Sequence, residues 1–363
     1  MSVMPSFSID DAQLLIQETV RGSKSVERID RHHALGRSTA KDIAATGDQP
    51  RFNAAAMDGW AVCGAPSSPY TPVSESRTGS AHHGTLLPGE AVSISTGAPV
   101  PRGATALVRR EHGKATSETL VIKNYQPGKH IDHLDIARMA ASGIAQIDVW
   151  RRPTLAILAT GDEIIPAGSE PTAFGTYDSL SPALLARLSQ MGTPASHLGV
   201  ARNDDHDIAR RIKSAGADIS IIIGGSSNGR HDRVRSSLTE LGLSILLPSV
   251  RMRPGKPFWF GRLGGGRFVF GLPGNPVAAL AAVELFIIPA LRALQGLPSE
   301  PEWIAIPALA MPGTGGHDRV RFARMPVAAN AELQVQSLGS SDSAALALCQ
   351  APMRYCPITA AKG

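Results

Sequence analysis

Between residues 153 and 297, short apolar runs alternate with amphipathic runs, and this alternation constrains the fold more than any other feature of the chain. The runs "PTLAILAT" and "ISIIIGG" have the length and composition of buried strands, whereas "SPALLARLSQMG" and "DDHDIARRIKSAG" have helical periodicity. Strands that alternate with helices are typical of a parallel sheet with helices on both faces. We therefore predict a parallel, three-layer α/β/α domain at this place in the chain.

The regions outside this domain predict other units, since 363 residues are too many for one ordinary core. Residues 8–20 predict a helix with Ser8 as its N-cap, and residues 34–45 predict a second, short helix. Short β-type runs separated by Pro, Gly and Ser turns follow, and the chain ends in further β-type sequence. We expect an N-terminal helical and linker domain (1–45 with 127–150), a β-rich domain (46–126), the α/β domain (151–297) and a C-terminal β domain (298–363).

Composition narrows the class of protein. The net charge is +5, but the basic residues form no long block and only 5% of residues are aromatic, which argues against a nucleic-acid partner. An anionic small substrate explains this charge equally well. No apolar run is long and charge-free enough to predict a membrane span, and the N-terminus has no secretory pattern. Three scattered cysteines indicate a reducing, cytoplasmic compartment and no disulfide or zinc framework.

Four loops with unusual chemistry are expected at the carboxyl ends of the α/β strands, where open sheets bind their ligands. Glycine-rich backbone and helix N-termini bind phosphates, and the cations Arg253 and Lys256 would neutralise them. Carboxylates opposite a phosphate usually hold Mg²⁺. The residues alone therefore predict a phosphate-bearing or nucleotide-like ligand with a divalent cation, bound by "TGDE" (160–163), "GGSSNGRHD" (224–232), "RMRPGKP" (251–257) and "LPGNP" (272–276).

Each of these features also has a plain structural interpretation. A glycine-rich loop can be only a turn, and a loop Asp can be only a helix cap. Asn275 as an N-cap, followed by Pro276 in the first turn, can be a simple connection between a strand and a helix. The run "HIDHLD" (130–135) has residue types that bind transition metals, but it can equally be a polar stretch between two elements. The residues leave these alternatives open.

Several motifs occur in the order of one family, along nearly the whole chain: "AAAMDGWAV" (54–62), "STGAPVPRGATALV" (95–108), "RRPTLAILATGDE" (151–163), "GGSSNGRHD", "RPGKP" and "GLPGNPVAAL". The chain thereby resembles the molybdopterin molybdenumtransferases, the bacterial MoeA and gephyrin E-domain family. The resemblance implies a cytoplasmic homodimer with a β-rich lasso domain, a molybdopterin-binding α/β domain and a C-terminal β-barrel-like domain. It also implies Mg²⁺-dependent insertion of molybdate into adenylylated molybdopterin, with release of AMP and formation of molybdenum cofactor. A molybdopterin adenylyltransferase and recipient molybdoenzymes are the implied partners.

The resemblance also implies which residues form the site. Three carboxylates would be catalytic: Asp58 of "MDGW", Glu163 of "TGDE", and Asp232 at the end of the glycine-rich loop. Glu163 and Asp232 would also hold the metal. The substrate would be bound by a larger set: Thr96, Asp178, Asp204, Gly224, Gly225, Ser227, Gly229, Arg253, Lys256, Pro257, Pro273, Gly274, Asn275, Pro276, Arg319, Arg324 and Ser340.

The chain departs from the family pattern at several motif positions, namely Asn53, Ala55, Leu180, Arg253 and Ala278, and after "PGKHID" it lacks the segment that carries "NIRxxGED". These departures keep an alternative open, namely a catalytically impaired paralogue that binds molybdopterin or molybdenum cofactor for a partner enzyme. A second alternative is a nucleotide hydrolase or adenylyltransferase that uses only the α/β domain.

Overall fold

The computed structural model describes residues 6–47, 51–64, 70–109, 127–170, 172–193, 195–202, 204–225 and 233–299, together with the backbone of residues 318–319, 323–324 and 336–337. Contacts divide the chain into two compact units. The first unit consists of residues 1–27 and 150–363, and the second of residues 28–149. The second unit is therefore inserted into the sequence of the first.

A six-stranded sheet in the order β10-β7-β11-β15-β14-β12 lies at the centre of the first unit. Its strands are β7 (Leu155–Thr160), β10 (Ala195–Ala201), β11 (Ile219–Ile223), β12 (Ser244–Leu247), β14 (Trp259–Leu263) and β15 (Arg267–Leu272). Strand β14 runs antiparallel to both of its neighbours, so the prediction of an all-parallel sheet is wrong there. The antiparallel direction follows from the link between β14 and β15, which consists only of Gly264–Gly266. A crossover between parallel strands needs a dozen or more residues.

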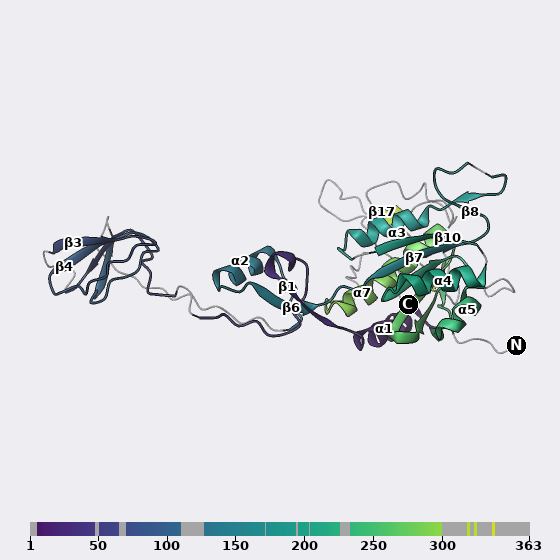
Figure 1. The fold of residues 1–363 in the computed structure, drawn as a ribbon, viewed down its shortest axis with the longest axis horizontal. Helices are drawn as coiled ribbons and strands as arrows, with labels where there is room; N and C mark the ends of the chain where they lie inside the picture. Colours follow the sequence, from purple (N-terminus) through teal and green to yellow (C-terminus); the bar gives the residue numbers. More distant parts are fainter. Residues whose placement is uncertain are drawn as a thin grey trace. The chain divides into compact units, whose positions relative to one another are not determined.

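Helices cover both faces of this sheet, as the alternation predicts (Figure 1). Successive residues of β11 point to opposite faces, so Ile221 and Ile222 belong to different hydrophobic clusters. The larger cluster joins one face to α1 (Ile9–Arg21), α3 (Leu180–Ser189), α6 (Pro276–Ala282) and α7 (Ile288–Leu294). The smaller cluster joins the other face to α4 (Asp205–Ala215) and α5 (Arg233–Ser237).

Helix α1 packs in the core of the α/β unit, whereas we predicted it as part of a separate N-terminal domain. Its predicted cap is confirmed, because the Ser8 side chain accepts a hydrogen bond from the Asp11 N–H. A π-helical turn, η4 (Val283–Ile287), separates α6 from α7, and Gln13 of α1 donates a hydrogen bond of 2.9 Å to the Leu285 carbonyl in that turn. Residues 276–294 have the length and hydropathy of a membrane span, but 78% of this stretch is buried, as in a core helix.

The second unit contains two small sheets. Strands β1 (Val26–Asp30) and β6 (Gln146–Trp150) pair next to η1 (Arg31–His33) and α2 (His133–Ala141). The predicted β-rich region forms a four-stranded sheet of β3 (Thr71–Ser76), β4 (Glu90–Ile94), β2 (Gly59–Val62) and β5 (Ala106–Arg109). The helix predicted at 34–45 is wrong: Gly36 has a φ of 71°, and Ser38 and Thr39 form β-bridges with His130 and Val149.

The C-terminal region is described only as backbone at three short strands, β16 (Asp318–Arg319), β17 (Ala323–Arg324) and β18 (Gln336–Ser337). A C-terminal β domain at 298–363, its barrel-like form and the four-way division of the chain therefore stay predictions.

An ion pair near the start of β7 gives a prediction about pH. Burial opposes ionisation of Asp218, but hydrogen bonds from Arg151 and Thr154 outweigh it and lower the pKa of this carboxyl. A lowered pKa stabilises the fold above the unfolded value of about 3.9, and this contribution disappears as the pH falls through the folded pKa. Because both side chains are more than a third exposed, solvent screens the pair and limits its contribution to about 1 kcal/mol.

We expect Asp218→Asn to lower the free energy of unfolding at pH 7 by this amount and to make little difference at pH 3. Urea unfolding of both proteins at the two pH values measures the effect. A difference that stays constant down to pH 3 would show that the carboxylate charge contributes nothing.

Candidate functional site

The strand ends of the central sheet define one edge. Ile223 of β11 lies opposite Ala159 of β7 and Leu272 of β15, and Gly271 of β15 lies opposite Trp259 of β14. The loops that follow β7, β11 and β15 therefore leave the same edge as the loop that precedes β14. The edge predicted from the sequence therefore exists. Strand β14 is antiparallel to both β12 and β15, so β12 runs in the same direction as β15. The loop that joins β12 to β14 consequently lies at this edge too.

Glycine backbone brings three of these loops into close contact. The Gly224 N–H donates a hydrogen bond of 3.1 Å to the Leu272 carbonyl. Gly224 has a φ of +87°, and a Cβ there would lie 2.5 Å from the Thr160 carbonyl oxygen. A Cβ on Gly274 would lie 3.8 Å from the Gly224 Cα. A side chain at Gly224 would push the first two loops apart, so glycine is required there, whereas a Cβ at Gly274 would make only an ordinary contact.

The last of these loops begins helix α6 in the way the sequence predicts. Asn275 is the N-cap, and its side-chain oxygen accepts a hydrogen bond of 3.1 Å from the Ala278 N–H. Pro276 occupies the first turn, where the missing N–H costs nothing. Pro273 is buried and Gly274 is exposed. The Ala278 side chain is buried.

Glu163 presents an exposed carboxylate next to this edge. The Glu163 side chain folds back over Gly161, where a Cβ would lie 2.7 Å from Oε2. Among the residues that the structure describes, the Glu163 carboxylate has no hydrogen-bond or ion-pair partner. No group of three or more His, Cys, Asp or Glu side chains in the described part of the chain could form a closed metal cage. A single open carboxylate fits Mg²⁺, which binds few protein carboxylates together with substrate oxygens.

The predicted cations lie on the chain that enters β14. Arg253 ends the short strand β13 (Met252–Arg253), and Lys256 follows in the next turn; both are exposed. Pro257 after it is half-buried. Strand β13 pairs in parallel with β16, and this register places the Arg319 backbone opposite Arg253. The Arg324 backbone lies in β17, which pairs with β18.

Two predicted substrate ligands serve as helix caps. Asp178 accepts a hydrogen bond of 3.0 Å from the Ser181 N–H at the start of α3, and its side chain is only 6% exposed. Its second oxygen lies 3.6 Å from Nε2 of His197, a residue that the sequence analysis missed. Asp204 accepts a hydrogen bond of 3.0 Å from the His206 N–H and caps α4. The contact of either residue with substrate stays a prediction.

In the second unit, the structure brings Asp58 and Thr96 together. Asp58 Oδ1 accepts hydrogen bonds from the Thr96 N–H at 2.6 Å and from Thr96 Oγ1 at 2.8 Å. Thr78 Oγ1 donates to the Thr96 carbonyl, which braces the same turn. The Asp58 side chain is thus oriented on an exposed surface at the start of β2. Four other predicted site residues, Ser227, Gly229, Asp232 and Ser340, lie outside the described residues.

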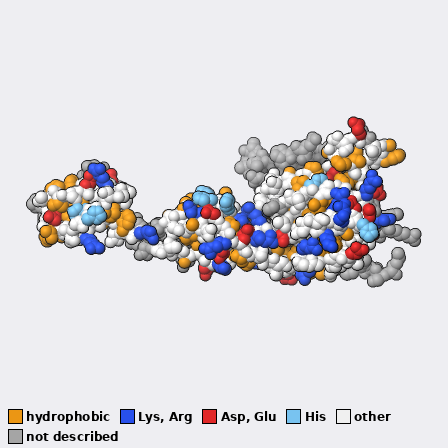
Figure 2. Space-filling model, viewed as in Figure 1, with side chains coloured by type: hydrophobic (Ala, Val, Ile, Leu, Met, Phe, Trp, Pro, Cys, Tyr) orange, Lys and Arg blue, Asp and Glu red, His pale blue; other side chains and the backbone are white. Residues whose placement is uncertain are grey.

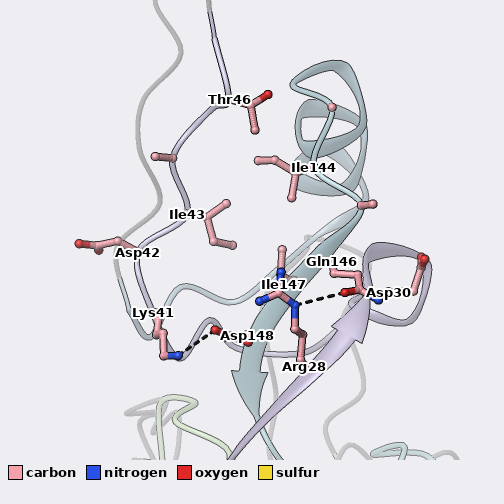
Figure 3. A pocket seen from close by; sticks show the side chains of 13 residues that line it. Arg28, Asp30, Lys41, Asp42, Ile43, Thr46, Ile144, Gln146, Ile147 and Asp148 are labelled. Carbon is pink, nitrogen blue, oxygen red and sulfur yellow. Dashed lines mark hydrogen bonds and ion pairs between the residues drawn. The ribbon is translucent and has the colours of Figure 1, made fainter.

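Two further features of the second unit do not form the site. Asp132 and Asp135 of "HIDHLD" form a capping box at the start of α2, and Asp135 pairs with Lys129 at 2.7 Å, so these carboxylates have structural partners. A pocket of about 550 Å³ opens between residues 41–46 and 143–148 (Figure 3). Two cations in its lining already have partners: Lys41 pairs with Asp148, and Arg28 donates a hydrogen bond to Gln146. None of the predicted site residues lines this pocket.

Two family models together match residues 7–293 of the chain. Residues 7–170 match the family model "MoeA N-terminal region (domain I and II)", and residues 156–293 match "Probable molybdopterin binding domain". A molybdopterin molybdenumtransferase from Nostoc sp. is 33% identical over 307 residues, which cover 76% of this chain and 70% of that protein. Molybdopterin molybdenumtransferase 2 from Mycobacterium tuberculosis is 30% identical over 327 residues, 80% of each chain.

The fold is also similar to that of a solved structure. The crystal structure of a molybdopterin biosynthesis MoeA protein from Pyrococcus horikosii has a TM-score of 0.67 at 25% identity, with 94% of this chain and 92% of that chain covered. Sequence identity, family models and fold therefore agree over most of the chain. The chain belongs to the molybdopterin molybdenumtransferase (MoeA) family.

Proposed function

We propose that this protein inserts molybdenum from molybdate into adenylylated molybdopterin, releasing AMP and forming molybdenum cofactor. The observation that carries this proposal is the convergence of the loops at Thr160, Gly224 and Gly274 beside the open carboxylate of Glu163. Gly274 is exposed, so its bare backbone lets a phosphate approach closely, and family membership identifies the class of ligand.

The residues at the edge have complementary roles in this proposal. Arg253 and Lys256 attract the molybdate and phosphate oxygens, which are negatively charged. Glu163, together with Asp232, would hold Mg²⁺, which when bound polarises the phosphate that links pterin and AMP. Asp58 enters the reaction oriented by Thr96. We propose that the protein acts as a cytoplasmic homodimer in which Asp58 and Thr96 complete the site of the partner subunit.

Two of the departures from the family pattern, Leu180 and Ala278, are compatible with activity. Leu180 and Ala278 lie in the packed interior, with exposed fractions of 4% and 2%. A hydrophobic residue suits such positions, and neither substitution removes a group from an exposed part of the edge. The proposed reaction places the protein between a molybdopterin adenylyltransferase, which would supply its substrate, and the molybdoenzymes that would receive its product.

The direct test supplies purified protein with adenylylated molybdopterin, molybdate and Mg²⁺. We expect release of AMP, loss of that release in EDTA, and recovery when Mg²⁺ is added in excess. The second readout is reconstitution of an apo-molybdoenzyme with the product. Tight binding of adenylylated molybdopterin without AMP release would contradict the proposal and favour a cofactor-binding paralogue.

A further inference from the structure

A short arm protrudes from the α/β unit immediately after Glu163. It comprises residues 164–170 and 172–177 and contains the paired strands β8 (Ile164–Ile165) and β9 (Thr176–Tyr177). Hydrophobic side chains gather on this part of the surface (Figure 2), above β8 as labelled in Figure 1. Phe174 is 93% exposed and Tyr177 is 43% exposed. Glu170 is the one charged residue among the described residues of the arm.

Both ends of the arm are fixed to the candidate site. The Thr176 N–H donates a hydrogen bond of 2.7 Å to the Glu163 carbonyl, and the Asp178 N–H donates one of 2.9 Å to the Ile165 carbonyl. Phe174 precedes Thr176 by two residues, so their Cα atoms are at most about 7 Å apart. A single nucleotide-sized ligand is therefore long enough to contact both Glu163 and the phenyl ring.

The backbone that carries Phe174 is held in place. The Gly175 N–H donates a hydrogen bond of 3.2 Å to the Thr172 carbonyl. A Cβ on Gly175 would clash with Thr172 Oγ1 and lie 3.1 Å from Ile165 Cδ1, so this turn packs tightly. The Tyr177 hydroxyl donates to the Ser169 carbonyl at 3.0 Å and braces the other side of the arm. The ring of Phe174 is thus exposed on a turn whose backbone is held by hydrogen bonds within the arm.

The loops at the sheet edge have no comparable side chain. Their described residues, 160–163, 224–225, 251–257 and 272–276, include no aromatic residue. Phe258 and Trp259, which follow one of these loops, are completely buried and have no free face. A ligand with both a phosphate and a planar ring would find its polar contacts at the edge and its aromatic contact on the arm.

We propose that Phe174 is a stacking platform for a planar heteroaromatic ring of the substrate, either the pterin or the adenine. This inference rests on the proposed function, because that function supplies a ligand with such rings. Stacking on an aromatic face tolerates different ring types, so the residue would contribute affinity rather than bond chemistry. One stacked ring corresponds to about a tenfold change in affinity.

The test is isothermal titration of the full-length protein with two separate probes, 6-carboxypterin and AMP. We expect Phe174→Ala to weaken binding of one probe about tenfold, which identifies the ring, and Phe174→Trp to retain wild-type affinity. Leu14→Ala serves as the control, since Leu14 of α1 is a 58% exposed apolar residue outside the edge. For adenylylated molybdopterin, we expect Phe174→Ala to raise KM while kcat changes little.

Several results would overturn the assignment. The first is that wild type and Phe174→Ala bind both probes with equal affinity. The second is that wild type binds neither probe measurably. The third is that Phe174→Ala no longer forms dimers while its probe affinity is unchanged. The last result would make the arm a protein contact instead. If wild type releases AMP and Phe174→Ala does so with the same KM, the stacking role fails and the proposed function stands. If wild type releases no AMP but its probe affinity depends on Phe174, the proposed function fails and the stacking role stands.

Discussion

Glu163→Gln will lower the rate of AMP release about a hundredfold, while the Kd for adenylylated molybdopterin changes only a few fold. The substitution keeps the size of the side chain and removes its negative charge. Glu163 is exposed and has no partner among the described residues, so its charge is free for a cation and the fold does not depend on it. A rate effect without an affinity effect is expected from a group that acts mainly in the transition state.

Single-turnover measurement of AMP, together with titration of the ligand, separates the two quantities. Glu240→Gln is the matched control, because Glu240 is an exposed carboxylate in η2 (Thr239–Leu241), just before the start of β12 and away from the edge. Equal losses of rate and affinity in Glu163→Gln would show that Glu163 only positions the ligand. Unchanged rates would remove it from the reaction.

Gly224→Ala will lower the free energy of unfolding by about 3 kcal/mol and will also impair AMP release. Part of the loss comes from a φ of +87°, which costs an L-residue about 1 kcal/mol or more. The larger part comes from the Thr160 carbonyl oxygen, only 2.5 Å from the new Cβ, which cannot move without disturbing the end of β7. Urea unfolding and the AMP assay measure the two effects.

Gly266→Ala separates the two causes. Gly266 has a φ of +74° in the link between β14 and β15, and no atom lies within 4 Å of the position of its Cβ. The Gly266→Ala substitution should therefore lower the free energy of unfolding only by the cost of the positive φ, about 1 kcal/mol, and should leave AMP release unchanged. Similar losses in both variants would mean that the loop contact at Gly224 can relax freely.

Local chemistry was readable from the sequence, and pairing between distant residues was not. The caps at Ser8 and Asn275 follow from side chains that lie within three residues of their hydrogen-bond partners, and the alternation of β11 follows from its own period of two. The false helix at 34–45 has favourable local composition. It is excluded by a bridge from Thr39 to Val149, more than a hundred residues away, which no local pattern reports.

The candidate site shows the same division. The sequence predicted that loops would meet at one edge, because the carboxyl ends of parallel strands lie at the same edge of a sheet. It could not predict that the Asp178 carboxylate turns inward to cap α3 and lies near His197, because the packing of α3 against β10 decides that orientation. Nor could it predict the turn that presents Phe174, where Ile165 leaves little room for a side chain at Gly175.

The union of residues 1–27 with 150–363 has a consequence for synthesis on the ribosome. Helix α1 is made before α7, yet its Gln13 bonds to Leu285, which is 272 residues later. An isolated amphipathic helix of this length is marginal in water. The apolar side chains of residues 9–21 therefore stay exposed to solvent until nearly three hundred residues have been translated. Folding of the first unit should therefore be completed only after translation has passed α7.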